Sequence, residues 1–426
     1  MKYMGNKKKT DEQLKKYLEL NKKISNKLKG GKSSIVDIFQ KMGEITEYID
    51  TGSYIINAVL SGSIFGGIPN ARSVEIAGPP QTGKSYLLMN IMRGAQARGY
   101  FVYYIDTEGS MEDADLLKFG INPEYAQIIK KLKTFNDVKF FINTIIDFKR
   151  EDPTLKIFIG LDSFGMLNTE ASLENARKGK YAEDMGKRAK EGRELFRTIT
   201  LDLSNLQIPF VFTNHTGKNL DLFAQESDIP SGGDGPTYAA SIILLLDRKI
   251  IKSDNDKKLY NTESGILVRL KTKKNRLAIP LEKYTVISFS HGMNPYIGLE
   301  QYVSWERCGV DRGIIYNEAQ LKEKYKGKAP TNTTGKPLEY FEFEHDKNKF
   351  YFVRNQKSKS YGVMDSIQNI QLDTYYTPSL FTQGTLARID EVVKSEFKYK
   401  DYEEQMMLQQ VAMNIAESEK IKLIDR

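Results

Sequence analysis

Within residues 45–298, segments with the hydrophobic pattern of a β-strand alternate with segments that have the hydrophobic pattern of an α-helix. Residues 100–106 and 157–161 form short runs rich in apolar and β-branched side chains, as is typical of parallel strands that are buried on both faces. Between them, residues 137–148 place apolar side chains at the spacing of one helix face. Strands that alternate with helices predict an α/β fold with a doubly wound, mostly parallel sheet, which binds ligands at the carboxyl ends of its strands.

The same pattern divides the chain into three parts. Residues 1–44 hold a lysine-rich arm and an amphipathic segment at 34–39, whose apolar face is expected to pack on the core or on a neighbouring subunit. Residues 45–298 hold the α/β core. The alternation of strand and helix patterns does not continue in residues 299–426. There, a β-hairpin near 338–353 followed by a charged helical end predicts a small α+β domain of unassigned role.

One glycine-rich stretch, residues 78–85, fits the phosphate-binding pattern G-x-x-x-x-G-K-[ST]. It lies between a strand-like segment at 72–77 and a helix-like segment at 86–92. Phosphate binding requires this context, because the N-terminus of the helix contributes to anion binding. A glycine turn that matched the pattern by chance would not require it. Lys84 is expected to contact the outer phosphates and the Ser85 hydroxyl to bind Mg²⁺. The residues expected to contact the nucleotide are Gly78, Pro79, Pro80, Gln81, Thr82, Gly83, Lys84, Ser85 and Tyr86. The sequence therefore predicts a site for a nucleoside triphosphate.

Two acids follow predicted strands of this core. Asp162 comes directly after the apolar run 157–161, where a carboxylate can bind Mg²⁺ opposite Ser85. Glu108 follows the neighbouring strand and could orient or deprotonate an attacking water. Either acid alone could instead cap a helix or face solvent. Together with the phosphate loop, they predict hydrolysis of the nucleotide.

Two long polar segments follow Asp162, at residues 168–184 and 216–236. Basic residues gather where the first meets a helix at 185–193, and glycines and lysines of this kind suit close approach to nucleic-acid phosphates. Mobile surface loops are the alternative. Residues 271–276 predict a basic hairpin, which on its own is typical of a solvated turn. The residues expected at a DNA surface from these segments are Met185, Gly186, Lys187, Arg188, Lys190, Lys218, Leu220, Phe223, Gly232 and Gly233.

Composition adds few constraints. The chain has 426 residues, 40% of them hydrophobic and 28% charged, which is typical of a soluble globular protein. The net charge of +8 matches the excess within residues 1–32, so this arm either meets nucleic acid or is a solvated tail. The single cysteine, Cys308, excludes an intramolecular disulfide. Neither a membrane span nor a signal peptide is expected, which favours a cytoplasmic location.

The ordered set of motifs resembles the RecA-type homologous recombinases, and among them the phage UvsX-like branch. The resemblance covers residues 45–298. It rests on the phosphate loop together with residues 51–53, 105–108, 161–163, 213–215, 231–233 and 274–278. A phosphate loop alone is shared by many ATPases, whereas this ordered set is specific.

The resemblance implies a DNA-dependent ATPase that uses ATP and Mg²⁺, forms a helical filament on single-stranded DNA, and exchanges strands with double-stranded DNA. It makes Glu108 the catalytic glutamate and places His215 where the γ-phosphate is sensed. It implies that Met185, Gly186, Lys190 and Arg197 contact DNA. It also implies that Lys274 and Arg276 contact the ATP of a neighbouring subunit. Arginine at the second of these positions departs from the lysine of the family, which keeps the charge and changes the geometry.

Two other functions stay open at this point. A hexameric DNA helicase on a related fold would share the phosphate loop, and an ATP-gated binding protein would lack strand exchange. The two DNA segments and the Lys274/Arg276 doublet favour the recombinase. A loading factor and a single-strand-binding protein would be its candidate accessory partners, and the host cytoplasm would be its location if a phage encodes it.

Overall fold

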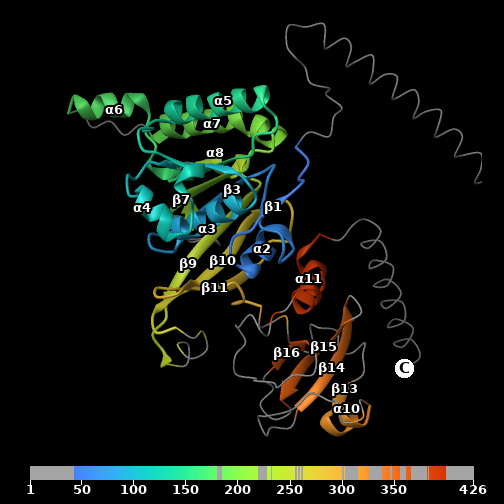
Figure 1. Ribbon diagram of the computed structural model, residues 1–426. Coiled ribbons are helices and arrows are strands. Elements are labelled where there is room, and N and C mark those ends of the chain that lie inside the picture. Colours follow the sequence, from blue (N-terminus) through green and yellow to red (C-terminus); the bar gives the residue numbers. More distant parts are fainter. Residues whose placement is uncertain are drawn as a thin grey trace, which may run out of the picture. The chain divides into compact units, whose positions relative to one another are not determined.

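A computed structural model describes most of the predicted core and parts of the chain beyond it (Figure 1). The described residues are 43–179, 185–218, 228–231, 233–254, 257, 260, 262–299, 302, 315–324, 326, 338–345, 348–355, 361–365, 381 and 383–399. The predicted basic arm, the amphipathic segment at 34–39 and Cys308 lie outside these residues.

The core is built on one ten-stranded sheet. Its strands lie in the order β12 (Gly292–Met293), β11 (Glu282–Ser288), β10 (Gly265–Asn275), β9 (Ile242–Ile250), β3 (Ser73–Gly78), β7 (Phe210–Lys218), β6 (Ile157–Asp162), β4 (Phe101–Asp106) and β5 (Ala126–Ile129), with β8 (Asp228–Pro230) paired to β7. Pairing is parallel from β9 to β5 and antiparallel from β9 to β12 and between β7 and β8. This arrangement confirms the predicted mostly parallel α/β sheet.

Helices bury both faces of the sheet. The helices α2 (Tyr54–Ser61) and α3 (Lys84–Ala97) pack on one face, and α5 (Phe135–Glu151) and α7 (Met185–Asn205) on the other (Figure 1). The remaining short elements of the core are β1 (Tyr48–Ile49), β2 (Ile68–Pro69), α4 (Asp113–Lys118), the 3-10 turns η1 (Pro123–Tyr125) and η2 (Phe164–Met166), α6 (Glu170–Arg177) and α8 (Asp234–Ala239).

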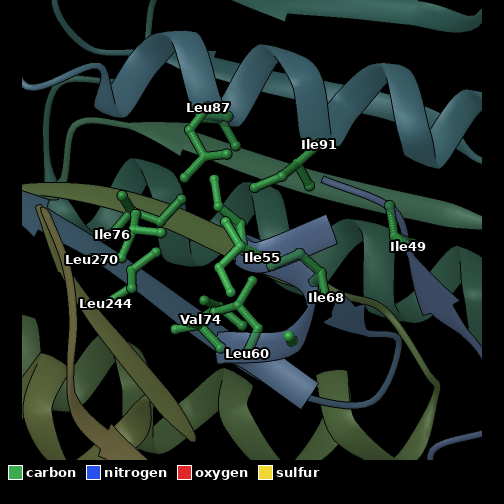
Figure 2. Close-up of a cluster of buried hydrophobic side chains, with 14 of the residues drawn as sticks. Ile49, Ile55, Leu60, Ile68, Val74, Ile76, Leu87, Ile91, Leu244 and Leu270 are labelled. Carbon is green, nitrogen blue, oxygen red and sulfur yellow. The ribbon is translucent and has the colours of Figure 1, made fainter. Parts of the chain in front are cut away.

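Side-chain alternation along the strands explains why both faces need cover. Val74 and Ile76 of β3 belong to the cluster that contains Leu87 and Ile91 of α3 (Figure 2). Phe212 of β7 belongs instead to the cluster beneath α5 and α7. Strands that are apolar on both sides in this way are the rule for parallel sheets with helical cover.

Beyond the core, a four-stranded antiparallel sheet has the order β13 (Ile315–Asn317), β14 (Leu338–His345), β15 (Asn348–Asn355) and β16 (Tyr361–Asp365). The pairing of β14 with β15 confirms the predicted hairpin. The described residues of this part of the chain include two helices, α10 (Glu318–Lys324) and α11 (Gln383–Phe397). The charged helical end that the sequence predicts is described only as far as residue 399.

The helix α11 packs on the core through one buried acid, Asp390. Its Oδ1 accepts hydrogen bonds from the Ser63 hydroxyl at 2.7 Å and from the backbone N–H of Ile64 at 2.8 Å. Ile389 and Val393 of the same helix belong to the hydrophobic cluster of α2 and α3. The boundaries at residues 44 and 298 stay predictions, and no role is assigned to residues 299–426.

Three expectations about loops need correction. The polar segment at 168–184 contains a helix, α6, which begins where the Thr169 side chain accepts a hydrogen bond from the backbone N–H of Ser172 at 3.0 Å. The segment at 216–236 contains the end of β7, then β8 and the start of α8. Residues 271–275 are not a turn, because β10 continues to Asn275 and pairs with β9 on both sides of a register shift between Thr272 and Lys274.

Candidate nucleotide-binding site

The phosphate loop joins β3 to α3 at the carboxyl end of the sheet. Gly83 has φ +91°, a left-handed conformation that favours glycine, and no side chain caps the helix that follows. The first backbone N–H groups of α3 therefore point toward the loop and can donate hydrogen bonds to an anion. The helix dipole also favours a negative charge at this position. The Thr82 hydroxyl closes the loop by donating to the Pro79 carbonyl oxygen at 2.9 Å.

Lys84 lies inside this loop, with 7% of its surface exposed. Its Nζ donates to the carbonyl oxygens of Gly78 and Pro79, both at 2.9 Å. Burial lowers the pKa of Lys84, while the negative charges of Asp162 and Glu108 act in the opposite direction. The ammonium group of Lys84 is thus held at the loop, and the negative charges of Asp162 and Glu108 favour its charged form.

Asp162 ends β6 with 4% of its surface exposed. The Tyr104 hydroxyl donates to its Oδ2 at 2.9 Å, and the Thr213 hydroxyl donates to its Oδ1. Burial and the charge of Asp162 raise the pKa of Tyr104, so this phenol stays a hydrogen-bond donor. Neighbouring strands β4 and β7 therefore hold the carboxylate in one orientation.

Glu108 follows β4, and its side chain is 35% exposed. Its Oε1 accepts a hydrogen bond from the Ser163 hydroxyl at 3.1 Å and lies 3.3 Å from His215 Nε2. The adjacent Asp106 holds the loop, because its carboxylate accepts from the backbone N–H groups of Glu108, Gly109 and Met111 at 2.7–3.1 Å. The sequence alone gave no role for Asp106, although this residue lies within the motif at residues 105–108.

The donor set at the strand ends suits Mg²⁺. Ser85 is exposed in the first turn of α3 and offers a hydroxyl, and Asp162 offers a carboxylate. Hard oxygen ligands of this kind, completed by phosphate oxygens and water, are the usual environment of Mg²⁺ in phosphoryl-transfer proteins.

Lys274 and Arg276 lie at the end of β10 and just beyond it. Lys274 Nζ donates to the carbonyl oxygens of Thr237 at 2.7 Å and Tyr238 at 3.2 Å, at the end of α8. Burial lowers the pKa of Lys274, as does the nearby charge of Arg276, while Glu75 acts in the opposite direction. Within one chain, Lys274 is thus bound to α8.

The helix α7 carries most of the predicted DNA residues that the structure describes. Gly186, Lys187, Lys190 and Arg197 are exposed along it. Arg188 differs, because it is partly buried and its guanidinium donates to the Gly165 carbonyl oxygen.

The second predicted DNA segment is described only at its two ends. The exposed Gly233 has φ +69° and precedes α8. For Met185 and Lys218 the structure describes only the backbone. Leu220, Phe223 and Gly232 lie outside the described residues.

A family model described as the RecA N-terminal domain matches residues 17–294. The chain belongs to the RecA family. It is 27% identical over 250 residues to the "Recombination and repair protein" of Enterobacteria phage T4, covering 58% of this chain and 60% of that protein. It is also 27% identical over 269 residues to "Protein RecA" of Mycoplasmopsis pulmonis (strain UAB CTIP), covering 63% of this chain and 74% of that protein. With "Protein RecA" of Thermus thermophilus the identity is 26% over 284 residues, covering 65% of this chain and 79% of that protein.

Family membership confirms the resemblance that the motifs indicated. The match to the phage protein spans less than two thirds of that protein's length. Among the described residues of this RecA-family chain, no helix is both long and apolar enough to cross a membrane.

Proposed function

We propose that this RecA-family chain is an ATP-dependent DNA recombinase, which forms a helical filament on single-stranded DNA and exchanges strands with a homologous duplex. The observation that carries the proposal is the convergence of Lys84, Asp162 and Glu108 at one edge of the sheet, with His215 in contact with Glu108. The names of the relatives, a recombination and repair protein and RecA proteins, support the same function.

The phosphate loop would bind ATP by exchanging hydrogen-bond partners. Lys84 Nζ donates to two loop carbonyls, and the phosphate oxygens of ATP would replace them as stronger, charge-assisted acceptors. Ser85 and Asp162 would hold Mg²⁺, which supplies neutralisation of the phosphate charge when it is bound. The open N-terminus of α3 would stabilise the same charge.

Glu108 would orient the attacking water and accept its proton. Asp106 fixes the backbone of Glu108, and Ser163 fixes its carboxylate, so that the base is positioned by two strands. His215 connects this base to β7, which leads directly into the second predicted DNA segment. A change in that segment on DNA binding would therefore reach Glu108 through a single contact.

The rival class, a ring-shaped helicase, gains no support from any described feature. Electron microscopy of the protein with ATP and single-stranded DNA separates the two functions. A continuous helical filament is expected, and closed rings would contradict the proposal. A loading factor and a single-strand-binding protein would be accessory partners, and the cytoplasm would be the site of action.

DNA binding is expected to weaken steeply with salt and to tolerate any base sequence. Contacts to phosphates release counterions, so the logarithm of affinity should fall with the logarithm of salt by about 0.7 per neutralised phosphate on single strands. Lys190→Ala and Arg197→Ala should each lower this slope, measured by fluorescence anisotropy with ATP. Arg150→Ala is the matched control, because Arg150 lies at the end of α5 and pairs with Asp202, which is at the far end of α7. An unchanged slope in both variants would refute the DNA role of α7.

The basic doublet is expected to act across a subunit interface. Lys274→Ala/Arg276→Ala protein keeps its own phosphate loop, Asp162 and Glu108, yet should hydrolyse little ATP when assayed alone. Mixed with Glu108→Gln protein, it should regain turnover, because some interfaces join an intact Glu108 to an intact basic pair. DNA-stimulated hydrolysis across mixing ratios measures this recovery.

Two other outcomes of the mixing experiment would refute a role across the interface. A fully active double mutant would mean that the doublet is a solvated surface feature, since exposed charges contribute little. An inactive mutant that no mixture rescues would mean that the doublet acts within its own subunit.

A further inference from the structure

Glu75 is a carboxylic acid enclosed in the sheet close to the phosphate loop. It lies on β3, three residues before Gly78, and none of its surface is exposed. Its neighbours in register are Phe212 of β7 and Ile243 of β9, which belong to the hydrophobic cluster on that face. A carboxylate in such surroundings is costly unless it is well paired.

The side chain of Glu75 is hydrogen-bonded to that of Asn214. Asn214 Nδ2 donates to Glu75 Oε1 at 2.8 Å and to the carbonyl oxygen of Ser231 at 2.7 Å, so that both of its N–H groups are used. The second oxygen of each group, Glu75 Oε2 and Asn214 Oδ1, is buried and has no hydrogen-bond partner among the described residues. Two acceptors without a donor thus belong to side chains that are already in contact.

A proton on Glu75 Oε2 would satisfy both atoms at once. A protonated carboxyl group donates one hydrogen bond and accepts another, and a primary amide does the same in the reverse order. The two groups can therefore close a ring of two hydrogen bonds, Oε2–H to Oδ1 and Nδ2–H to Oε1. A charged carboxylate could make only the second bond.

Two charged groups act on Glu75 through space, Lys273 and Lys274 of β10. They favour the carboxylate, as does the hydrogen bond from Asn214, but burial is the largest effect and raises the pKa of Glu75 to about 7. Lys274 gives its hydrogen bonds to the carbonyl oxygens at the end of α8.

We propose that Glu75 carries a proton in the folded protein and forms a closed acid–amide pair with Asn214, which positions the ATP-hydrolysing site relative to the second DNA segment. Glu75 lies on the strand that leads into the phosphate loop. Asn214 precedes His215, which contacts Glu108, and it also holds the backbone at Ser231, where the second segment returns to the core. The positioning role rests on the proposed ATPase function, whereas the proton does not.

The proton can be tested on the full-length protein without ATP or DNA. Glu75→Gln imitates the protonated acid, because its amide can close the same ring. The infrared difference spectrum of wild type minus Glu75→Gln should contain a protonated carboxyl C=O band that is lost as the pH rises, while wild type minus Glu151→Gln, an exposed acid, should contain none near neutral pH. A carboxylate band alone at pH 6 would overturn the proposal.

Linkage gives a second, independent readout. The native state binds more protons than the unfolded state between the ordinary pKa of glutamate and the raised one, so Glu75 costs stability as the pH rises through that window. The melting temperature of Glu75→Gln minus that of wild type should therefore increase from about pH 5 to about pH 7 and level off above the raised pKa. A difference that is constant, or that falls with pH, would contradict a buried proton.

The positioning role is tested by DNA-stimulated hydrolysis. Glu75→Gln should keep kcat within about twofold near pH 6.5, whereas Glu75→Ala leaves Asn214 unpaired and should lower kcat roughly tenfold, the size expected for one unsatisfied buried group. The ratio of Glu75→Gln to wild-type kcat should rise with pH. If Glu75→Gln is as impaired as Glu75→Ala while its melting temperature is unchanged, the negative charge is what matters, and the acid–amide pair is refuted. An inactive wild type would instead count against the proposed function.

Discussion

Replacing Lys84 with alanine is expected to abolish ATP hydrolysis and the part of DNA affinity that depends on ATP. Phosphoryl transfer depends almost wholly on positioning and charge stabilisation, and Lys84 is the ammonium group inside the phosphate loop. Loss of a preorganised charge of this kind costs roughly 10²–10³-fold in kcat. Phosphate release with and without single-stranded DNA measures the effect.

Two comparisons isolate the charge of Lys84 from its position. Lys84→Arg keeps a positive group but replaces a compact ammonium with a planar fork that does not fit the same space, so it too should be strongly impaired. Lys118→Ala, an exposed lysine paired with Asp115 on α4, should hydrolyse ATP like wild type. Turnover in Lys84→Ala comparable to wild type would remove the phosphate loop from the mechanism.

Glu108→Gln is expected to bind ATP normally and to hydrolyse it at least about 10²-fold more slowly, the usual contribution of a general base. Glutamine keeps the hydrogen bond from Ser163 but cannot accept a proton from water. If ATP lies between subunits, the variant should also stay on DNA longer than wild type. Single-turnover hydrolysis and DNA dissociation after dilution measure the two effects.

Glu151→Gln removes an exposed carboxylate from the end of α5 and serves as the matched control. It should match wild type in both measurements. Unchanged turnover in Glu108→Gln would assign the role of base to another carboxylate. Slow turnover with rapid loss of DNA would contradict the placement of ATP between subunits.

The nucleotide site was predictable from sequence because its chemistry depends on local order. A glycine loop between a strand and a helix, and acids directly after parallel strands, must meet at one edge of a sheet. The structure accordingly brings Asp162 and Glu108 close enough to Lys84 to act on its pKa. The contact of His215 with Glu108 follows from the same rule, since His215 on β7 and Glu108 after β4 lie at the same edge of the sheet, on either side of β6.

What could not be predicted depends on side chains that meet across long sequence separations. Asp390 binds Ser63 and Ile64, although more than 300 residues separate them, and a single acid in a helical pattern gives no sign of its partner. The pair of Glu75 and Asn214 could not be predicted either, because nothing in the sequence of the two strands distinguishes these residues from other strand residues.

The prediction of a turn at residues 271–276 was wrong for a different reason. Its lysines suggested a turn, yet the alternation of β10 continues as far as Lys273, because Leu270 and Thr272 are buried whereas Lys271 and Lys273 are only partly buried. A register shift between Thr272 and Lys274 then interrupts the alternation. Period two was present in the sequence, and the charge of the lysines concealed it.

Strand exchange between a circular single strand and a homologous linear duplex tests the central claim most directly. Wild-type protein with ATP and Mg²⁺ should convert these substrates to joint molecules and then to nicked circles, which gel electrophoresis separates. A heterologous duplex and the Lys84→Ala protein should give no product. Unwinding of the duplex without pairing, or binding and hydrolysis with no joint molecules from homologous DNA, would contradict a recombinase.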